Sequence, residues 1–171
     1  MFFYHSEHKE ELHESGISFL NKNEADSVYS LVNRFLKAGI EPNQIGVITP
    51  YKGQKDCIMA LMWEPRFCEI EVASVDSFQG REKDFIIFST VRSNRNGDIG
   101  FLNDHRRLNV ALTRAKFGLI ILGNAKTLMG HEPWWKLLTH YQEKQCLVTG
   151  PNISTLAPCE IYLEKPKLRY Y

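Results

Sequence analysis

The chain has 171 residues, of which 43% are hydrophobic and 24% charged, and its formal net charge is +1. This length gives one domain with a hydrophobic core and is too short for two domains of ordinary size. No apolar run approaches the roughly 20 residues of a membrane-spanning helix, so we expect no membrane contact, and the near-neutral charge does not by itself indicate nucleic-acid binding.

The N-terminus, the histidines and the cysteines do not show the patterns of a secreted or metal-binding protein. The first six residues lack the basic segment and long apolar stretch of a secretory signal, so we expect a cytoplasmic protein, with the nucleus as the alternative. His5, His8 and His13 lie in a charged stretch, where we favour a solvated loop over a metal site. The cysteines are too widely spaced for a zinc site or a disulfide framework, and they are Cys57, Cys68, Cys146 and Cys159.

Apolar runs and helical patterns alternate along the first half of the chain. Residues 1–4 are a weak strand candidate. Residues 24–38 repeat apolar side chains at helical spacing, with Asn23 as the expected cap and Gly39 as the stop. A buried strand is predicted at 45–49, a helix at 50–62 and a second strand at 70–74.

The same alternation continues in the second half. We predict strands at 84–91 and 117–123, helices at 104–115 and 133–144, and a weaker strand at 146–149. Strands that alternate with helices predict an α/β fold, a parallel sheet with helices on both faces. We therefore expect one domain over residues 1–150 and a loosely attached extension over 151–171.

Ligands of open parallel sheets bind outside the carboxyl ends of the strands, which here means after Thr49, Ser74, Val91 and Gly123. At the first of these places Thr49 is expected to cap a helix, and Pro50 to take its first position. The free amides that follow would seat a phosphate. A plain helix start explains the Thr-Pro pair equally simply, and the local pattern alone favours it.

The segment SVDSFQGREKD (residues 74–84) joins two predicted strands. Ser74 offers a hydroxyl to a phosphate, Gln79 offers a donor and an acceptor, and Glu82 suits sugar hydroxyls. Gly80 allows a positive φ or a close backbone approach. The alternative is a charged surface turn, and the segment alone does not decide between them.

The third segment, RRLNVALTRAK (residues 106–116), is basic. Arg107 and Arg114 are seven residues apart, so we expect them on one helix face with Ala111 between them, and Leu108, Leu112 and Ala115 as the packing face. Guanidinium groups bind phosphate in a forked geometry, although a solvated basic helix is the commoner origin of such a pattern. The chain has no Gly-x-x-x-x-Gly-Lys-Ser/Thr sequence, so a nucleotide bound here would need another domain for most of its triphosphate and metal.

Together these segments resemble the second RecA-like lobe of superfamily 1 helicases, most nearly the up-frameshift type of nonsense-mediated mRNA decay. The resemblance rests on QIGVITPYKGQ (44–54), VASVDSFQGREKDF (72–85), GFLND (100–104) and RRLNVALTRA (106–115). It implies a RecA-like sheet of the P-loop NTPase superfamily, in a lobe that lacks the phosphate-binding loop itself.

The resemblance also implies roles for single residues. Arg114 matches the arginine that reaches the γ-phosphate of ATP, Glu82 the acidic residue at the ribose, and Gln79 and Asp76 the loop that couples the nucleotide to the nucleic acid. Thr49 and Ser74 match hydroxyls that contact the nucleic-acid backbone. We thus assign the nucleotide site to Gln79, Gly80, Glu82, Arg107 and Arg114, and the nucleic-acid site to Thr49, Pro50, Tyr51, Ser74, Val75 and Asp76, with no metal ligand.

On this resemblance the chain is expected to be the second motor lobe of an ATP-dependent helicase that moves on single-stranded RNA, in mRNA quality control. Its expected partners are single-stranded RNA, a first RecA-like lobe that holds most of the ATP and Mg²⁺, and mRNA-decay factors. Three alternatives stay open: a lobe of a DNA helicase, a non-catalytic module that binds nucleic acid or a helicase partner, and a nucleotide-binding protein of unrelated function.

The departures from the family matter as well. The phosphate-binding loop, the acidic pair that holds magnesium and a further γ-phosphate arginine lie upstream of the position that Met1 matches. We therefore expect a fragment, a truncated gene product or a separately encoded lobe, inactive as an ATPase on its own.

Overall fold

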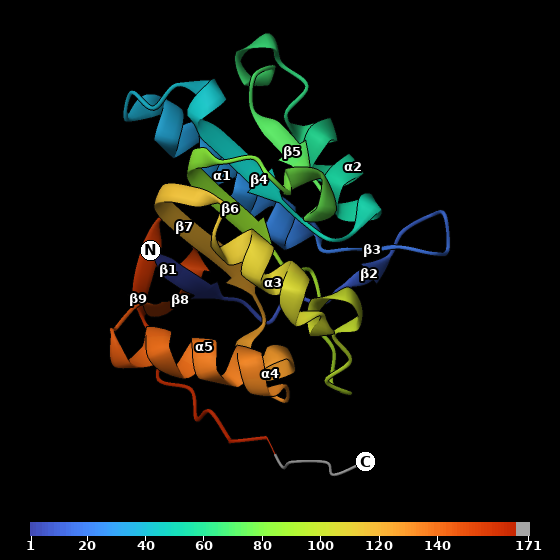
Figure 1. Cartoon of the computed structure of the whole chain (residues 1–171), viewed down its shortest axis with the longest axis vertical. Helices are drawn as coiled ribbons and strands as arrows, with labels where there is room; N and C mark the ends of the chain where they lie inside the picture. The colour runs from blue at the N-terminus through green and yellow to red at the C-terminus, as the bar shows by residue number, and fades with distance from the viewer. Residues whose placement is uncertain (167–171) are drawn as a thin grey trace.

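A computed structural model describes residues 1–166, which form a seven-stranded sheet in the order β5-β4-β6-β7-β1-β8-β9 (Figure 1). Every neighbouring pair is parallel except the last, in which β9 runs antiparallel to β8. The predicted parallel α/β fold is therefore confirmed. The strands are β1 (Phe2–His5), β4 (Ile45–Ile48), β5 (Glu71–Ala73), β6 (Lys83–Ser89), β7 (Ala115–Gly123), β8 (Leu147–Asn152) and β9 (Thr155–Pro158).

Helices cover both faces of this sheet because its central strands are apolar on both sides. Ile87 of β6 packs on one face and its neighbour Phe88 on the other, as the two-residue period of a strand requires. One face is covered by α1 (Lys22–Lys37) and α2 (Lys52–Leu61). The other is covered by α3 (His105–Leu112), α4 (Ala125–Leu128) and α5 (Glu132–Glu143), with the 3-10 turns η3 (Asp76–Phe78) and η4 (Gly100–Asn103).

Smaller elements complete the structure. β2 (Glu11–Leu12) and β3 (Phe19–Leu20) form an antiparallel hairpin apart from the main sheet, to the right in Figure 1. The 3-10 turns η1 (Pro42–Gln44) and η2 (Pro65–Phe67) precede β4 and β5. This hairpin has no counterpart among the predicted elements, because two-residue strands are too short to show a period.

Two predicted helix starts are wrong. α1 is capped by Asn21 and not by Asn23, because the Asn21 side chain accepts from Glu24 N at 3.2 Å while also donating to the carbonyl oxygen of His8. α2 begins at Lys52 after Tyr51, so Thr49 is not its cap and Pro50 is not its first residue. Thr49 instead prolongs the strand pairing, since its N–H donates to the carbonyl oxygen of Ala73.

The predicted common helix face for Arg107 and Arg114 is also wrong. α3 ends at Leu112, and Arg114 lies outside the helix, where its carbonyl oxygen accepts from Lys83 N as β7 begins. Ala111 is fully buried in the core and does not lie between two exposed arginines. The apolar run of β7, which reaches back to Ala115, ends the helix earlier than the sequence pattern suggested.

The sheet continues past Gly150, where we expected a loose extension. β8 runs to Asn152 and pairs with β9. Further along, Gln142 of α5 donates to the carbonyl oxygen of Ile161 at 2.9 Å, and Trp135 Nε1 donates to that of Leu163 at 3.2 Å. These contacts attach residues 153–163 to the lobe, whereas the boundary at residue 150 stays a prediction and residues 167–171 of the extension lie outside the described part.

A buried carboxylate holds the end of the central strand β6. Glu24 accepts from Ser89 Oγ at 2.6 Å and from Val91 N at 2.9 Å. Val91 has a φ of 69°, a left-handed conformation that costs a β-branched residue energy. Gln54 donates to Ser89 Oγ and to the carbonyl oxygen of Asn21, which links the start of α1 to α2 and β6. Burial raises the pKa of Glu24 to about 7, although these hydrogen bonds oppose it.

Glu24→Gln is expected to remove a pH dependence from the free energy of unfolding. The raised pKa of Glu24 means that the folded state holds this proton more tightly than the unfolded state. Its contribution to stability is fully present below the unfolded value of 4.5 and is lost as the pH rises through about 7. Relative to the glutamine variant, the wild type should lose about 2 kcal/mol between about pH 5 and about pH 8, measured by urea unfolding. Glu143→Gln, at an exposed position, should follow the wild type; identical curves for all three proteins would contradict the assignment.

Candidate functional site

The predicted site residues lie at opposite ends of the strands. Ser74 follows β5 at the carboxyl ends, and Glu82 precedes β6 at the amino ends. Because β4 lies between these strands and is parallel to both, the connecting loop must run the length of the sheet. The predicted nucleic-acid residues therefore occupy the carboxyl ends of β4 and β5, whereas Gly80, Glu82 and Arg114 gather at the amino ends of β6 and β7.

Arg114 is held at the amino end of β7 by neutral groups. Its guanidinium donates to the carbonyl oxygens of Val110 at 3.1 Å and Arg81 at 3.3 Å, and to Thr113 Oγ1 at 3.0 Å. Within residues 1–166, no carboxylate lies within ion-pair distance of it. The side chain is half-buried, so its charge is oriented but not compensated. Such a group can bind an anion.

The loop beside Arg114 is exposed. Gly80 has a φ of 78°, the first of the two possibilities that the sequence left open, and no atom beyond its chain neighbours lies within 4 Å of the position that a Cβ would take there. Gln79 closes η3 through its N–H, which donates to the carbonyl oxygen of Asp76 at 3.2 Å. The Gln79 and Glu82 side chains point into solvent-accessible surroundings, and their roles toward a nucleotide stay predictions.

Arg107, predicted at the nucleotide, is bound to Asp76, predicted at the nucleic acid. The guanidinium donates to both carboxylate oxygens of Asp76, at 3.1 and 3.0 Å. The structure thus brings together one member of each predicted site and separates Arg107 from Arg114. Since both side chains are at the surface, this ion pair is worth roughly 0–1 kcal/mol and can open at small cost.

The two hydroxyls predicted at the nucleic-acid backbone differ in accessibility. Thr49 is 1% exposed, and its Oγ1 has no hydrogen-bond partner within the described residues. Ser74 Oγ lies nearer the surface, where it is 2.9 Å from Ser77 Oγ. Pro50 and Val75 line a small hollow together with Phe101 and Arg107. Thr49, Tyr51 and Val75 lie beneath the surface, at 1%, 3% and 4% exposed.

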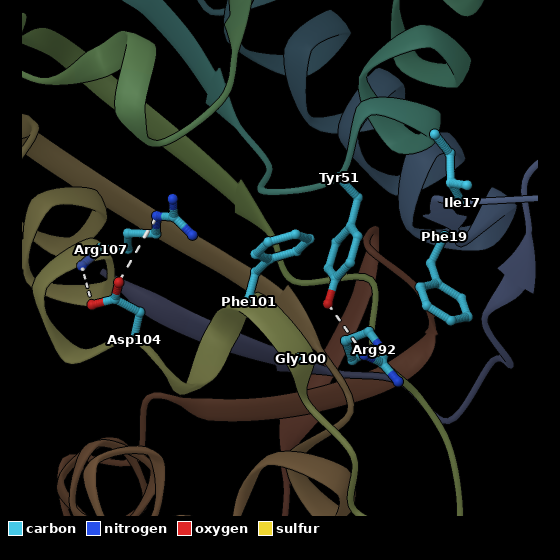
Figure 2. Close-up of a pocket in the computed structure, with 8 residues that line it drawn as sticks. All are labelled: Ile17, Phe19, Tyr51, Arg92, Gly100, Phe101, Asp104 and Arg107. Atoms are coloured by element: carbon cyan, nitrogen blue, oxygen red, sulfur yellow. Dashed lines mark hydrogen bonds and ion pairs between the residues drawn. The ribbon is translucent and has the colours of Figure 1, made fainter. Parts of the chain in front are cut away.

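Tyr51 forms the floor of a larger hollow of about 390 Å³ (Figure 2). Its ring centroid is 5.9 Å from that of Phe19 on the β2–β3 hairpin and 5.7 Å from that of Phe101 in η4. Ile17, Arg92 and Arg107 complete most of the lining. Burial raises the pKa of the Tyr51 hydroxyl. Of these residues only Tyr51 and Arg107 were predicted, and Phe101 gave no signal beyond its place in the GFLND segment.

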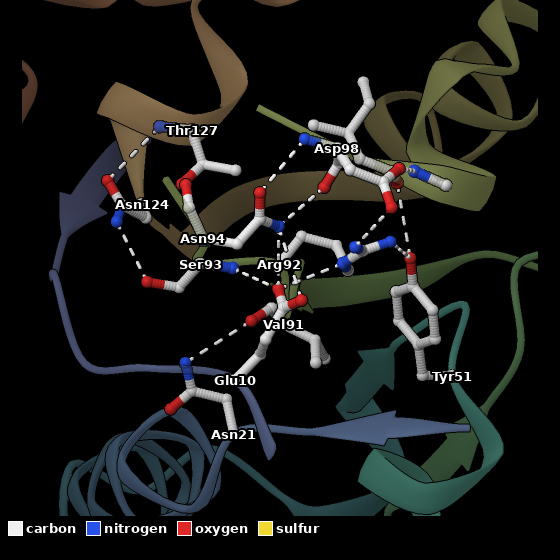
Figure 3. A network of polar contacts seen from close by, with 12 residues as sticks. Glu10, Asn21, Tyr51, Val91, Arg92, Ser93, Asn94, Asp98, Asn124 and Thr127 are labelled. Atoms are coloured by element: carbon white, nitrogen blue, oxygen red, sulfur yellow. Dashed lines mark hydrogen bonds and ion pairs between the residues drawn. The ribbon is translucent and has the colours of Figure 1, made fainter. Parts of the chain in front are cut away.

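Arg92 ties this hollow to the N-terminal segment (Figure 3). The buried guanidinium donates to Glu10 Oε2 at 3.0 Å and to Asp98 Oδ2 at 2.9 Å, and its carbon lies 4.4 Å from the ring centroid of Phe19. Glu10 also accepts from Ser93 N at 2.6 Å. The position after Val91 was among the predicted strand ends where ligands bind, but a single arginine there does not by itself predict a role. Its partner Glu10 is 82 residues away in the sequence.

A second, more polar hollow of about 780 Å³ lies at the carboxyl ends of β1, β6 and β7. Lys9, Arg95 and Lys126 line it, and Lys126 is paired with Glu7 at 2.7 Å. His5, at the end of β1, accepts from Ala125 N at Nδ1, and burial lowers the pKa of its ring. Within residues 1–166, no three His, Cys, Asp or Glu side chains are placed to hold one metal ion.

Comparison with known proteins decides the family. The family described as "AAA domain" matches residues 1–126. The chain belongs to this family. This match and the relatives described next confirm the predicted resemblance to the second RecA-like lobe of up-frameshift-type helicases.

The relatives of this lobe are much longer proteins. A regulator of nonsense transcripts 1 homolog of Arabidopsis thaliana is 54% identical, and one of Neurospora crassa is 52% identical, each over 99% of this chain. The ATP-dependent helicase NAM7 of Saccharomyces cerevisiae is 46% identical over the same share. The chain spans 14%, 16% and 18% of these three relatives, respectively. In the described part of the lobe, no helix combines the length and apolar character of a membrane crossing.

Arg92→Ala is expected to lower the free energy of unfolding of this lobe by about 3–5 kcal/mol, because it leaves the Glu10 carboxylate, only 12% exposed, without its cation. Arg95→Ala, three residues further and exposed, should change it by less than about 0.5 kcal/mol. Urea unfolding measures both. A loss at Arg92 no larger than that at Arg95 would show that the network of Figure 3 does not support the fold.

Proposed function

We propose that this chain is the second motor lobe of an ATP-dependent helicase that translocates on single-stranded RNA in mRNA quality control. It supplies an arginine finger and a grip on the nucleic-acid backbone. The observation that carries the proposal is the fixed, uncompensated guanidinium of Arg114 beside the exposed loop 79–82. The relatives include an ATP-dependent helicase and regulators of nonsense transcripts, which supports the proposed reaction and pathway.

The proposed role of Arg114 is electrostatic. Three neutral acceptors orient its guanidinium and leave its charge available, so it can stabilise negative charge that develops on a transferred phosphoryl group. Glu82, on the same edge of the sheet, offers a carboxylate to ribose hydroxyls, and Gln79 offers an amide. Because the carboxyl-end residues lie at the far end of the strands, the nucleotide contacts of Arg114 and Glu82 are separated in space from the nucleic-acid grip, whereas Arg107 lies beside it.

ATP with Mg²⁺ is the proposed cofactor, held mainly by a first RecA-like lobe. The residues of this chain fit one part of it: a guanidinium without a bound carboxylate suits a phosphate oxygen, and the exposed Glu82 suits a sugar. The bound nucleotide supplies the phosphoryl group, and this chain orients its donors toward it. The remaining phosphate contacts are proposed for the first lobe, because this sequence has no phosphate-binding loop.

The grip on RNA is proposed at Pro50, Ser74 and Asp76, with the buried Thr49, Tyr51 and Val75 behind them. Backbone contacts do not depend on sequence, as a translocating motor requires. Single-stranded DNA is the alternative substrate. mRNA-decay factors are the further proposed partners, and the cytoplasm is the proposed location.

Arg114→Ala is expected to lower the RNA-stimulated ATPase rate of this chain mixed with a matching first lobe by about three to five orders of magnitude, the range known for arginine fingers. Arg106→Ala is the matched control, an exposed arginine of α3, and should leave kcat near that of the wild type. Equal rates for the two variants would refute the finger. No turnover by the wild type, with the lobes shown to associate, would favour the non-catalytic binding module.

The isolated 171-residue chain is expected to hydrolyse no ATP, with or without single-stranded RNA, because its sequence has no phosphate-binding loop. A phosphate-release assay at millimolar ATP tests this. Turnover that disappears in Arg114→Ala would overturn the prediction and require a complete site within this chain.

A further inference from the structure

The hollow above Tyr51 exposes apolar side chains that the fold leaves uncovered. Phe101 is 56% exposed and Ile17 is 89% exposed, on opposite sides of the buried ring of Tyr51 (Figure 2). With Phe19 they form a surface that we call the aromatic groove. Neighbouring exposed apolar groups around a concave surface indicate a binding site.

The floor of the aromatic groove is preformed. Tyr51 is 3% exposed, and its hydroxyl donates to the carbonyl oxygen of Ile99 at 3.3 Å and accepts from Arg92. The charge of Arg92 is compensated by Glu10 and Asp98. A ligand therefore meets fixed ring faces and a neutralised guanidinium, and its binding does not require the floor to rearrange.

One rim of the aromatic groove carries charged side chains. The guanidinium carbon of Arg107 lies 5.6 Å from the ring centroid of Phe101, which gives this side of the groove a second planar cation. Asp104 lines the same rim, and its carboxylate accepts from Arg106 N and Arg107 N. A phosphate at this rim would be repelled by Asp104, whereas a neutral planar ring would not.

The groove adjoins the proposed backbone grip. Phe101 and Arg107 line both the groove and the small hollow that contains Pro50 and Val75. A base next to phosphates held near Ser74 and Pro50 can therefore reach Phe101. Rings and guanidinium planes are the surfaces on which proteins stack unpaired bases.

We propose that the aromatic groove binds one base of the single strand, stacked on Phe101 above the floor made by Tyr51 and Phe19. The proposal rests on the proposed function, because the backbone grip is what brings the base to this place. Stacking tolerates any base, so the contact anchors the strand without reading its sequence.

The test compares two exposed phenylalanines. Binding of an oligouridylate that carries one 2-aminopurine is measured by fluorescence over a salt series, for the chain alone and with a matching first lobe added. Phe101→Ala is expected to raise Kd about 5- to 100-fold, the cost of one lost stack, with an unchanged salt slope because no phosphate contact is lost. Phe101→Trp should restore the affinity. Phe117→Ala removes a ring that is 77% exposed at the amino end of β7, and should bind like the wild type.

Each other result has a definite meaning. If the wild type binds RNA and Phe101→Ala leaves that affinity unchanged, the proposed base site in the aromatic groove is wrong, whereas the proposed backbone grip is not affected. Absence of RNA binding by the wild type in both settings would overturn the proposed function and the groove with it. If Phe101→Ala spares RNA affinity but weakens association with the first lobe, the groove holds a protein side chain and not a base.

Discussion

The left-handed turn at Val91 is the constraint on which the candidate site depends. β6 is an inner strand of the sheet, and the chain must leave it sharply after Ser89. A valine adopts that backbone only because the Glu24 carboxylate holds its N–H and the Asn21 amide holds its carbonyl oxygen. The turn directs Arg92 toward Glu10 and Tyr51, and so it sets the floor of the aromatic groove.

This constraint joins segments that are distant in the sequence. Asn21 and Glu24 begin α1, Gln54 belongs to α2, and Ser89 ends β6. The polar contacts that join these residues to one another are buried, so each partner is needed to satisfy the others. The Gln54 that follows the Thr-Pro-Tyr segment thus has a structural role, because it fixes α2 to α1 and β6 beneath the proposed grip.

The architecture could be predicted from the sequence because it follows from periodicity. Apolar runs such as residues 84–91 and 117–123 form parallel strands within two residues of their predicted limits, and Gly80 has a positive φ, one of the two possibilities that the sequence left open. The helix ends and the surroundings of the site could not be predicted. Asn21 displaces Asn23 as the cap, and Arg92 pairs with Glu10, through contacts between segments that no local pattern reveals.

The assignment of residues to sites was limited in the same way. The predicted nucleotide set was chosen along the sequence, and the structure divides it because the loop 74–82 crosses the sheet from one end to the other. Arg107 lies near the carboxyl ends with Asp76, and Arg114 lies near the amino ends with Arg81. α3 packs beside that loop and extends from Arg107 toward Arg114. A movement of α3 would therefore displace residues at both ends of the sheet.

The position of β1 has a consequence for how the chain folds. This first strand lies between β7 and β8, with Phe2 opposite Ile120 and Phe3 opposite Leu147. During synthesis its partners emerge more than a hundred residues after it, so the N-terminal strand must wait unpaired while β4, β5 and β6 can already associate. Pairing of β1 with β7 and β8 therefore closes long loops, which makes folding slower than in a sheet whose neighbouring strands are consecutive in the sequence.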